Sequence, residues 1–224
     1  MPWPERGGIY GDVAAFSFYG NKNITTGEGG MVISRDPAVT ERIRRKRGAG
    51  MTSGTYQRLG LRAGSYDVTM LGYNYRMTEL NAAIGLKQLE KLPNWNDTRR
   101  HLMTEYSAAA ARLCPEVRLP VCDATRNPHI MAAVLPANAD RMAVMGGLSD
   151  DGVQTSMHYP AIHTLSWYRE RYPDIRLPIT EAFAKRELTL PLHPKMTVAD
   201  VEHVLASLAR HLGNQGETDD VASH

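Results

Sequence analysis

The feature that most constrains the fold is a pair of short apolar runs near the N-terminus, at residues 12–18 and 30–34. A polar turn closes the first run, and a glycine-rich turn precedes the second. Short apolar runs bounded by turn residues are typical of strands that are buried on both faces. Such strands belong in the interior of a mostly parallel sheet covered by helices, so the sequence predicts an α/β fold.

Helix signals are clear on the C-terminal side of these runs. Asp36 can cap a helix that begins at Pro37 and carries a basic run up to Gly48, where positive charge meets the negative end of the helix dipole. Residues 76–92 repeat apolar side chains at helical spacing, and we expect Pro93 to end that helix because proline removes a backbone hydrogen bond.

The second half alternates helices with short apolar segments. We expect a helix over 96–113, strands over 130–135 and 153–157, and a terminal helix that ends at Gly213. The start of that terminal helix is marked by Thr197 and Asp200, which form a capping-box pattern. The chain is therefore expected to consist of two domains, residues 1–95 and 96–213, and a disordered tail at 214–224.

Bulk composition excludes little. A net charge of +2 does not argue for nucleic-acid or membrane partners, and no apolar run reaches membrane-spanning length. Cys114 and Cys122 suit a reducing compartment better than a disulfide framework, so we expect a cytoplasmic protein. The eight histidines have no metal-ligand spacing, and no metal site is expected.

Lys22 is the first candidate for chemistry. It lies just past the first apolar run, between Asn21 and Asn23. A lysine at the end of a buried strand can be partly desolvated, which frees its amine for covalent chemistry with a carbonyl group. Most lysines are solvated, however, so position alone leaves a surface lysine as the alternative.

The surrounding segments decide between these interpretations. Residues 16–30 read Phe-Ser-Phe, a short link, Lys-Asn and then Thr-Gly-Glu-Gly-Gly, and residues 71–80 read Leu-Gly-Tyr-Asn-Tyr-Arg-Met-Thr-Glu-Leu. Met-His-Tyr-Pro at 157–160 and Leu-Pro-Leu-His-Pro at 190–194 follow. In this order the segments closely resemble the DegT/StrS-type nucleotide-sugar aminotransferases, which depend on pyridoxal 5'-phosphate (PLP).

The resemblance implies a fold-type-I PLP-dependent transferase. Residues 1–95 would be the C-terminal part of the PLP-binding large domain, and residues 96–213 a smaller C-terminal α+β domain. The implied reaction transfers an amino group from glutamate or glutamine to a nucleotide-linked keto-sugar.

The resemblance also implies roles for individual residues. Lys22 would hold the cofactor covalently and act as the catalytic residue, and Ser17 would bind the cofactor phosphate. Asn74 would reach the phosphate of a cofactor held by the neighbouring subunit, which implies a homodimer. His158, Tyr159 and His163 would lie on the substrate side.

In the family the acidic partner of the pyridine nitrogen lies well upstream of the lysine, and only 21 residues precede Lys22 here. We therefore expect an incomplete large domain, exposed apolar strand faces and a tendency to associate, either as a homodimer or with a chain that supplies the N-terminal half. The alternative function is a catalytically inactive truncated homologue that dimerises with a full-length aminotransferase. A dehydratase on the same fold is disfavoured, because such relatives replace the cofactor lysine.

Overall fold

The computed structural model describes residues 11–52, 66–121, 123 and 126–217, with the side chains of 214–217 left out of that description. The chain divides into two compact units, residues 1–93 (unit 1) and 94–224 (unit 2). The sequence placed this division between residues 95 and 96. That unit 1 is the C-terminal part of a larger domain stays a prediction.

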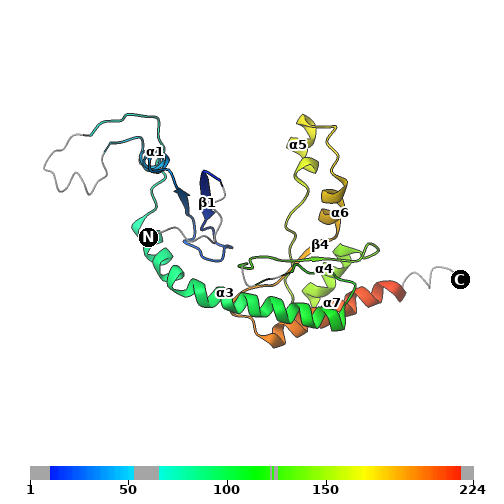
Figure 1. Ribbon diagram of the computed structural model, residues 1–224. Helices are drawn as coiled ribbons and strands as arrows, with labels where there is room; N and C mark the ends of the chain where they lie inside the picture. The colour runs from blue at the N-terminus through cyan, green and yellow to red at the C-terminus, as the bar shows by residue number, and fades with distance from the viewer. Residues whose placement is uncertain (1–10, 53–65, 122, 124–125, 218–224) are drawn as a thin grey trace. The chain divides into compact units, whose positions relative to one another are not determined.

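The two apolar runs of unit 1 form an antiparallel hairpin (Figure 1). Strand β1 (Val13–Ser17) pairs with β2 (Gly30–Ser34) in a register that runs from Val13↔Ser34 to Ser17↔Gly30. The connection between them holds no helix, and parallel neighbours need a long crossover, so consecutive strands here pair antiparallel.

The apolar runs are typical of strands buried on both faces of an intact sheet, but in this chain neither β1 nor β2 is buried in that way. Their large apolar side chains are 44–49% exposed, at Val13, Phe16, Met31 and Val32. The apolar run predicted a strand correctly, but burial depends on what packs on it, and a two-stranded sheet offers too little surface to cover both faces. The expectation of exposed apolar strand faces agrees with these values.

Helix α1 (Pro37–Arg47) confirms its sequence signals at both ends. The Asp36 carboxylate accepts a hydrogen bond from the Ala38 N–H at 2.7 Å, and the Gly48 N–H donates to the Arg45 carbonyl at 3.0 Å. These bonds satisfy backbone groups that a helix end leaves without partners. Helix α1 packs on β2.

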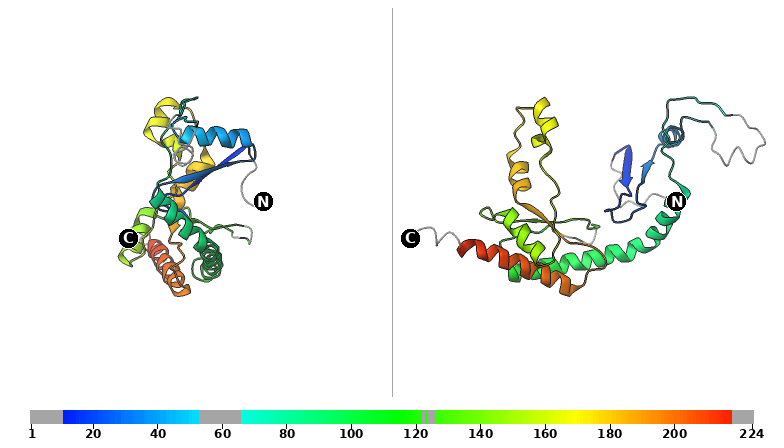
Figure 2. Two further views of the ribbon diagram at one scale, coloured as in Figure 1. Left: turned by 90° about the vertical axis from the view of Figure 1, so that its left-hand side faces the viewer. Right: turned by 180° about the vertical axis from the view of Figure 1, so that it is seen from behind.

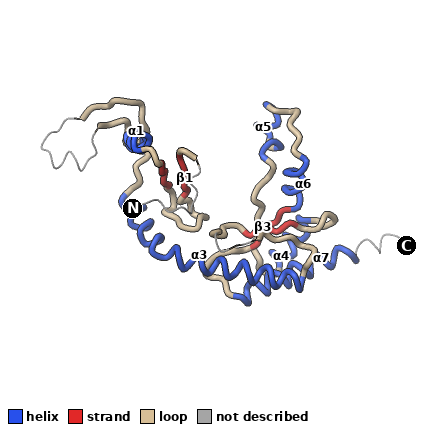
Figure 3. Tube along the Cα trace, in the orientation of Figure 1, coloured by secondary structure: helices blue, strands red, loops and turns tan. Residues whose placement is uncertain are grey.

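The predicted stop at Pro93 is wrong, because α3 (Glu79–Leu113) runs through it, as the tube in Figure 3 shows. Proline in a helix removes one hydrogen bond, to the carbonyl four residues earlier, and can be tolerated when both flanks favour helix. Residues on both sides do so, from Leu86 to Leu92 and from Ala108 to Ala111. The segments predicted as two helices form a single helix in the structure.

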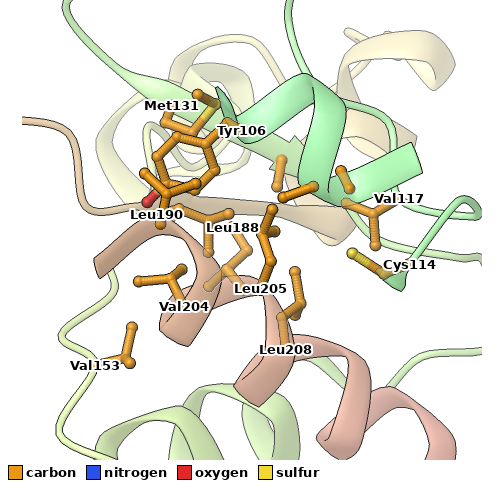
Figure 4. Close-up of a cluster of buried hydrophobic side chains, with 14 of the residues drawn as sticks. Tyr106, Cys114, Val117, Met131, Val153, Leu188, Leu190, Val204, Leu205 and Leu208 are labelled. Atoms are coloured by element: carbon orange, nitrogen blue, oxygen red, sulfur yellow. The ribbon is translucent and has the colours of Figure 1, made fainter. Parts of the chain in front are cut away.

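Unit 2 contains the hydrophobic core of the molecule (Figure 4). Strands β3 (Met131–Val134) and β4 (Glu187–Leu190) pair antiparallel, and helix α4 (Arg141–Asp150) packs on α7 (Val198–Glu217). Twenty buried apolar residues form one cluster, and they come from these elements, from the second half of α3 and from the connections between them. The side chains of Tyr106, Leu188, Leu190, Leu205 and Leu208 lie inside it.

The predicted capping box of α7 is confirmed. The Thr197 N–H donates to the Asp200 carboxylate at 2.7 Å, and the Asp200 N–H donates to the Thr197 hydroxyl at 3.2 Å. The predicted end at Gly213 is wrong, because the helix continues to Glu217. Residues 214–217 of the predicted disordered tail are thus helical, and residues 218–224 lie outside the described part of the chain.

Residues 157–186 form an arm that projects from the β3–β4 sheet, as both Figures 1 and 2 show. It carries the 3-10 turn η1 (Ile162–Thr164) and helices α5 (Ser166–Arg171) and α6 (Pro178–Arg186), none of which has a buried residue. The predicted strand over 153–157 is reduced to an isolated bridge between Ser156 and Thr189. Among the described residues, no helix is long and apolar enough to cross a membrane.

Candidate active site

The turn that carries Lys22 is an extension of the β1–β2 hairpin. Beyond the last strand pair, the Phe18 N–H donates to the Gly29 carbonyl and the Thr26 N–H donates to the Phe18 carbonyl, each at 2.9 Å. Between them, the Lys22 N–H donates to the Tyr19 carbonyl at 3.0 Å and closes a reverse turn. Lys22 is half-buried in this turn.

The same turn is fixed to the first half of α3. The Gln88 side-chain oxygen accepts from the Thr25 N–H at 3.3 Å, and the Asn81 side-chain amide donates to the Glu28 carbonyl at 2.9 Å. Two polar side chains on one helix thus hold the loop just before the glycine-rich stretch and within it. The backbone around Lys22 is therefore set by the hairpin and by α3 together.

Ser17 is the last residue of β1 and is exposed. Its Oγ accepts from the Tyr19 N–H at 3.3 Å, so the hydroxyl proton is left to donate to another group. A hydroxyl donor at the end of β1 is thus followed, five residues later in sequence, by an amine in the turn. A hydroxyl group can donate to a phosphate and an amine can react with a carbonyl carbon, so these residue types suit the roles that the resemblance implies for Ser17 and Lys22.

Asn74 lies in an extended segment beside the last turn of α1. The N–H groups of Tyr73 and Tyr75 donate to carbonyls of that turn at 2.6 and 2.9 Å, and the two rings stack with centroids 5.0 Å apart. Successive side chains of an extended segment point to opposite sides, so Asn74 faces away from the stacked rings. Gly72 permits the close approach, because a Cβ there would lie 2.2 Å from the Gly50 nitrogen.

His158 and Tyr159 lie in unit 2, at the base of the arm. The two rings meet edge to face with centroids 4.6 Å apart. The His158 N–H donates to Oε2 of Glu187 at 2.8 Å, and His158 Nδ1 lies 2.8 Å from the Thr189 hydroxyl. Thr189 also donates to Oε1 of Glu187 at 2.5 Å. The histidine is thus held through both its backbone and its ring.

His163 lies further along the arm and is held by a different carboxylate. Its Nε2 lies 2.8 Å from Oε1 of Glu181, which also accepts from the Leu177 N–H at 3.0 Å. The Leu177 N–H, with His163 second, holds the pKa of Glu181 below its ordinary value. Both side chains line a cavity of about 360 Å³ that also contains Arg169 and Arg176.

The structure thus places the six predicted residues in two groups. Lys22, Ser17 and Asn74 belong to unit 1, and the other three, His158, Tyr159 and His163, belong to unit 2. Among the described residues, no three His, Cys, Asp or Glu side chains are grouped so that they could hold a metal ion.

Sequence reasoning missed Glu187 and Thr189. Both are buried in β4, at 1% and 8% exposure. A signal was available, because Glu187 and Thr189 alternate with Leu188 and Leu190 along the strand, and alternation puts the two polar side chains on one face. A carboxylate buried in an apolar strand needs hydrogen-bond donors, and here they come from His158 and Thr189.

Comparison with known proteins agrees with the sequence motifs. The model of the DegT/DnrJ/EryC1/StrS aminotransferase family matches residues 5–209. The chain belongs to this family. The predicted resemblance is therefore confirmed over nearly all of the sequence.

Solved structures give the fold. The chain matches the aminotransferase TlmJ from Streptoalloteichus hindustanus at 30% identity and a TM-score of 0.80, covering 93% of this chain and 54% of TlmJ. It matches S. venezuelae DesV, solved in complex with a ketimine intermediate, at 31% identity and a TM-score of 0.74, covering 89% of this chain and 52% of DesV. Helicobacter pylori PseC, an aminotransferase of pseudoaminic acid biosynthesis, matches at 23% identity and a TM-score of 0.82, covering 92% of this chain and 54% of PseC.

These matches and the family assign a PLP-dependent transferase fold to the residues that this chain shares with those enzymes. The chain spans about half the length of each enzyme that it matches.

Proposed function

We propose that this protein acts in PLP-dependent amino transfer to a nucleotide-linked keto-sugar, with Lys22 as its catalytic residue. The observation that carries the proposal is the family match over residues 5–209, which includes the turn of Lys22 and the strand end of Ser17. Glutamate or glutamine is the proposed amino donor.

PLP would supply an electron sink that stabilises negative charge at the substrate carbon. In this proposal Lys22 binds the cofactor through Nζ and carries a proton to and from the substrate carbon. Ser17 donates its hydroxyl proton to the cofactor phosphate. Asn74 would donate a side-chain N–H to the phosphate of a cofactor held by the neighbouring subunit, which makes a homodimer part of the proposal.

The substrate side of the proposal rests on unit 2. His158 and Tyr159 offer an imidazole and a phenol beside each other at the base of the arm. His163 lies in a cavity with two arginines, whose positive charge suits an anionic group of a nucleotide. A cytoplasmic location stays a prediction.

Covalent labelling tests the proposal. The chain would be mixed with PLP, reduced with borohydride and digested, and the labelled lysine identified by mass spectrometry. We expect the label at Lys22 and its loss in Lys22→Ala. Lys87→Ala is the matched control, because Lys87 is an exposed lysine paired with Glu90 at 2.9 Å. A label spread over surface lysines and unchanged in Lys22→Ala would contradict the proposal.

A second candidate function is favoured by one observation in unit 1. An apolar groove of about 690 Å³ is lined by β2, α1 and the first half of α3, with Met31, Val32, Ile43, Leu86 and Leu89 among its residues. Exposed apolar surface of this size suits a protein partner. We propose as the alternative that the chain dimerises with a full-length family member without catalysing the reaction itself.

Co-expression with a full-length homologue distinguishes the two functions. A complex that forms through the groove, and in which Lys22→Ala changes neither assembly nor activity, would favour the dimerisation role. Loss of activity in Lys22→Ala would favour catalysis by this chain.

A further inference from the structure

Glu187, Thr189 and His158 form a short hydrogen-bonded chain that starts at a buried carboxylate. Oε2 of Glu187 accepts the backbone N–H of His158 at 2.8 Å, and Oε1 accepts the Thr189 hydroxyl at 2.5 Å. Glu187 is 1% exposed and Thr189 is 8% exposed, so protein groups rather than bulk water provide these partners.

Counting protons along this chain fixes the histidine tautomer. A threonine hydroxyl has one proton, and Thr189 gives it to Glu187. At 2.8 Å from His158 Nδ1, the Thr189 oxygen can then act only as an acceptor. A bare Nδ1 would face it lone pair to lone pair, so Nδ1 must carry the proton. Ser156 Oγ, at 3.3 Å from Nδ1, is a weaker second partner.

We propose that Glu187 and Thr189 are positioning residues that hold His158 in the Nδ1–H tautomer, so that its Nε2 presents a lone pair as a hydrogen-bond acceptor. Nε2 has no hydrogen-bond partner among the residues that the structure describes. This inference rests on the proposed function. It assigns a hydroxyl group of the sugar as the ligand of His158, because a neutral acceptor binds a hydrogen-bond donor and repels a phosphate oxygen.

Backbone hydrogen bonds hold these three residues in place. Thr189 and Ser156 exchange two backbone hydrogen bonds at 2.8 and 3.1 Å, which join the segment before His158 to β4. The Glu187 carbonyl accepts from the Arg141 side chain at 3.1 Å. Glu187 and Thr189 therefore lie on β4, where both are buried, and the Ser156 pairing holds the segment that leads to His158 against that strand.

Solid-state NMR of the full chain, labelled with ¹⁵N-histidine and sedimented so that self-association does not matter, tests this assignment. Spectra would be taken at alkaline pH, with His158 assigned by the signal lost in His158→Gln. We expect a protonated Nδ1 and an unprotonated Nε2. His163 is the internal reference with the opposite tautomer, because its Nε2 faces the Glu181 carboxylate at 2.8 Å.

Glu187→Gln should reverse the direction of the hydrogen bonds that link position 187, Thr189 and His158. The glutamine oxygen must take the position that accepts the His158 N–H, so the NH₂ group faces Thr189. Thr189 then donates to Nδ1, and the proton of His158 moves to Nε2. The signal of a protonated Nδ1 should therefore be lost in Glu187→Gln. Thr189→Ser, which keeps the hydroxyl, should retain that signal, and His163 should be unchanged in both variants.

A wild-type His158 with its proton on Nε2 would overturn the assignment, and this result needs no variant to fold. A protonated Nδ1 that persists in Glu187→Gln would overturn the role of Glu187. The measurement uses no PLP, so its outcome is separate from the labelling of Lys22. A labelled Lys22 with the wrong His158 tautomer would leave the proposed function standing and remove only this inference.

Discussion

Units 1 and 2 contain similar apolar side chains but bury them to different degrees. Leu205 and Leu208 of α7 are 0% exposed, whereas Leu86 and Leu89 of α3 are 65% and 48% exposed. Among the described residues of unit 1, Ile24 is the single buried apolar side chain. The comparison teaches that an amphipathic pattern predicts which face of an element is apolar, while burial requires a second element to cover that face.

Leucine truncation in each unit gives the largest expected difference. Leu205→Ala should lower the free energy of unfolding by about 2–5 kcal/mol, because it leaves a cavity in a packed core. Leu86→Ala should change it by no more than about 0.5 kcal/mol, since the side chain is already exposed. Urea unfolding followed by circular dichroism measures both. Equal losses would mean that unit 1 has a core of its own.

Self-association should depend on the exposed face of unit 1. Val32→Thr should weaken it roughly tenfold, because burying a hydroxyl without a partner costs about 1–3 kcal/mol. Val198→Thr is the matched control, since Val198 of unit 2 is 40% exposed and Val32 is 44% exposed. Sedimentation velocity over a concentration series measures the effect. Equal weakening of self-association by Val32→Thr and Val198→Thr would contradict a special role for the exposed face of unit 1.

Asp151 gives unit 2 a smaller, pH-dependent contribution. Its carboxylate accepts from Ser207, from His211 at 2.8 Å and from Arg210 at 2.5 Å. The Ser207 hydroxyl is the largest cause that lowers its pKa from 3.8 to about 2. Because the folded pKa is depressed, the stabilisation is fully present above the unfolded value near 3.8 and is lost as pH falls through about 2.

Urea midpoints of the wild type and Asp151→Asn, measured from pH 5 down to pH 2, check this expectation. The difference between the two midpoints should be largest at pH 5 and should fall steeply towards pH 2. A constant difference would show that the carboxylate charge contributes nothing. Hydrogen exchange in β1 and β2 of unit 1 should be the same in both proteins.

Local chemistry made part of this structure predictable from sequence. The Asp36 cap and the Thr197–Asp200 capping box depend on neighbours within a few residues, and both were predicted correctly as local structure. The turn after the first apolar run was predicted as well, although side chains of α3 also hold it. The continuation of α3 through Pro93 was not predicted, because helix preference on both sides outweighed one lost hydrogen bond.

The hydrogen-bonded chain that starts at Glu187 was missed for a different reason. Its partner His158 is 29 residues away in sequence, and only the pairing of Thr189 with Ser156 brings them together. The mostly parallel sheet that the apolar runs indicated differs from the antiparallel pairing of β1 and β2, because an apolar run does not say which strand lies beside it. Contacts between distant segments are the part that sequence reasoning could not supply.

Amide hydrogen exchange on the chain alone tests most directly the claim that unit 2 has a core and that the described part of unit 1 lacks one. Slow exchange requires an opening that exposes buried backbone, so amides of β3, β4 and α7 should exchange roughly a thousandfold more slowly than those of β1 and β2. Protection of β1 and β2 equal to that of β3 and β4 would contradict the account.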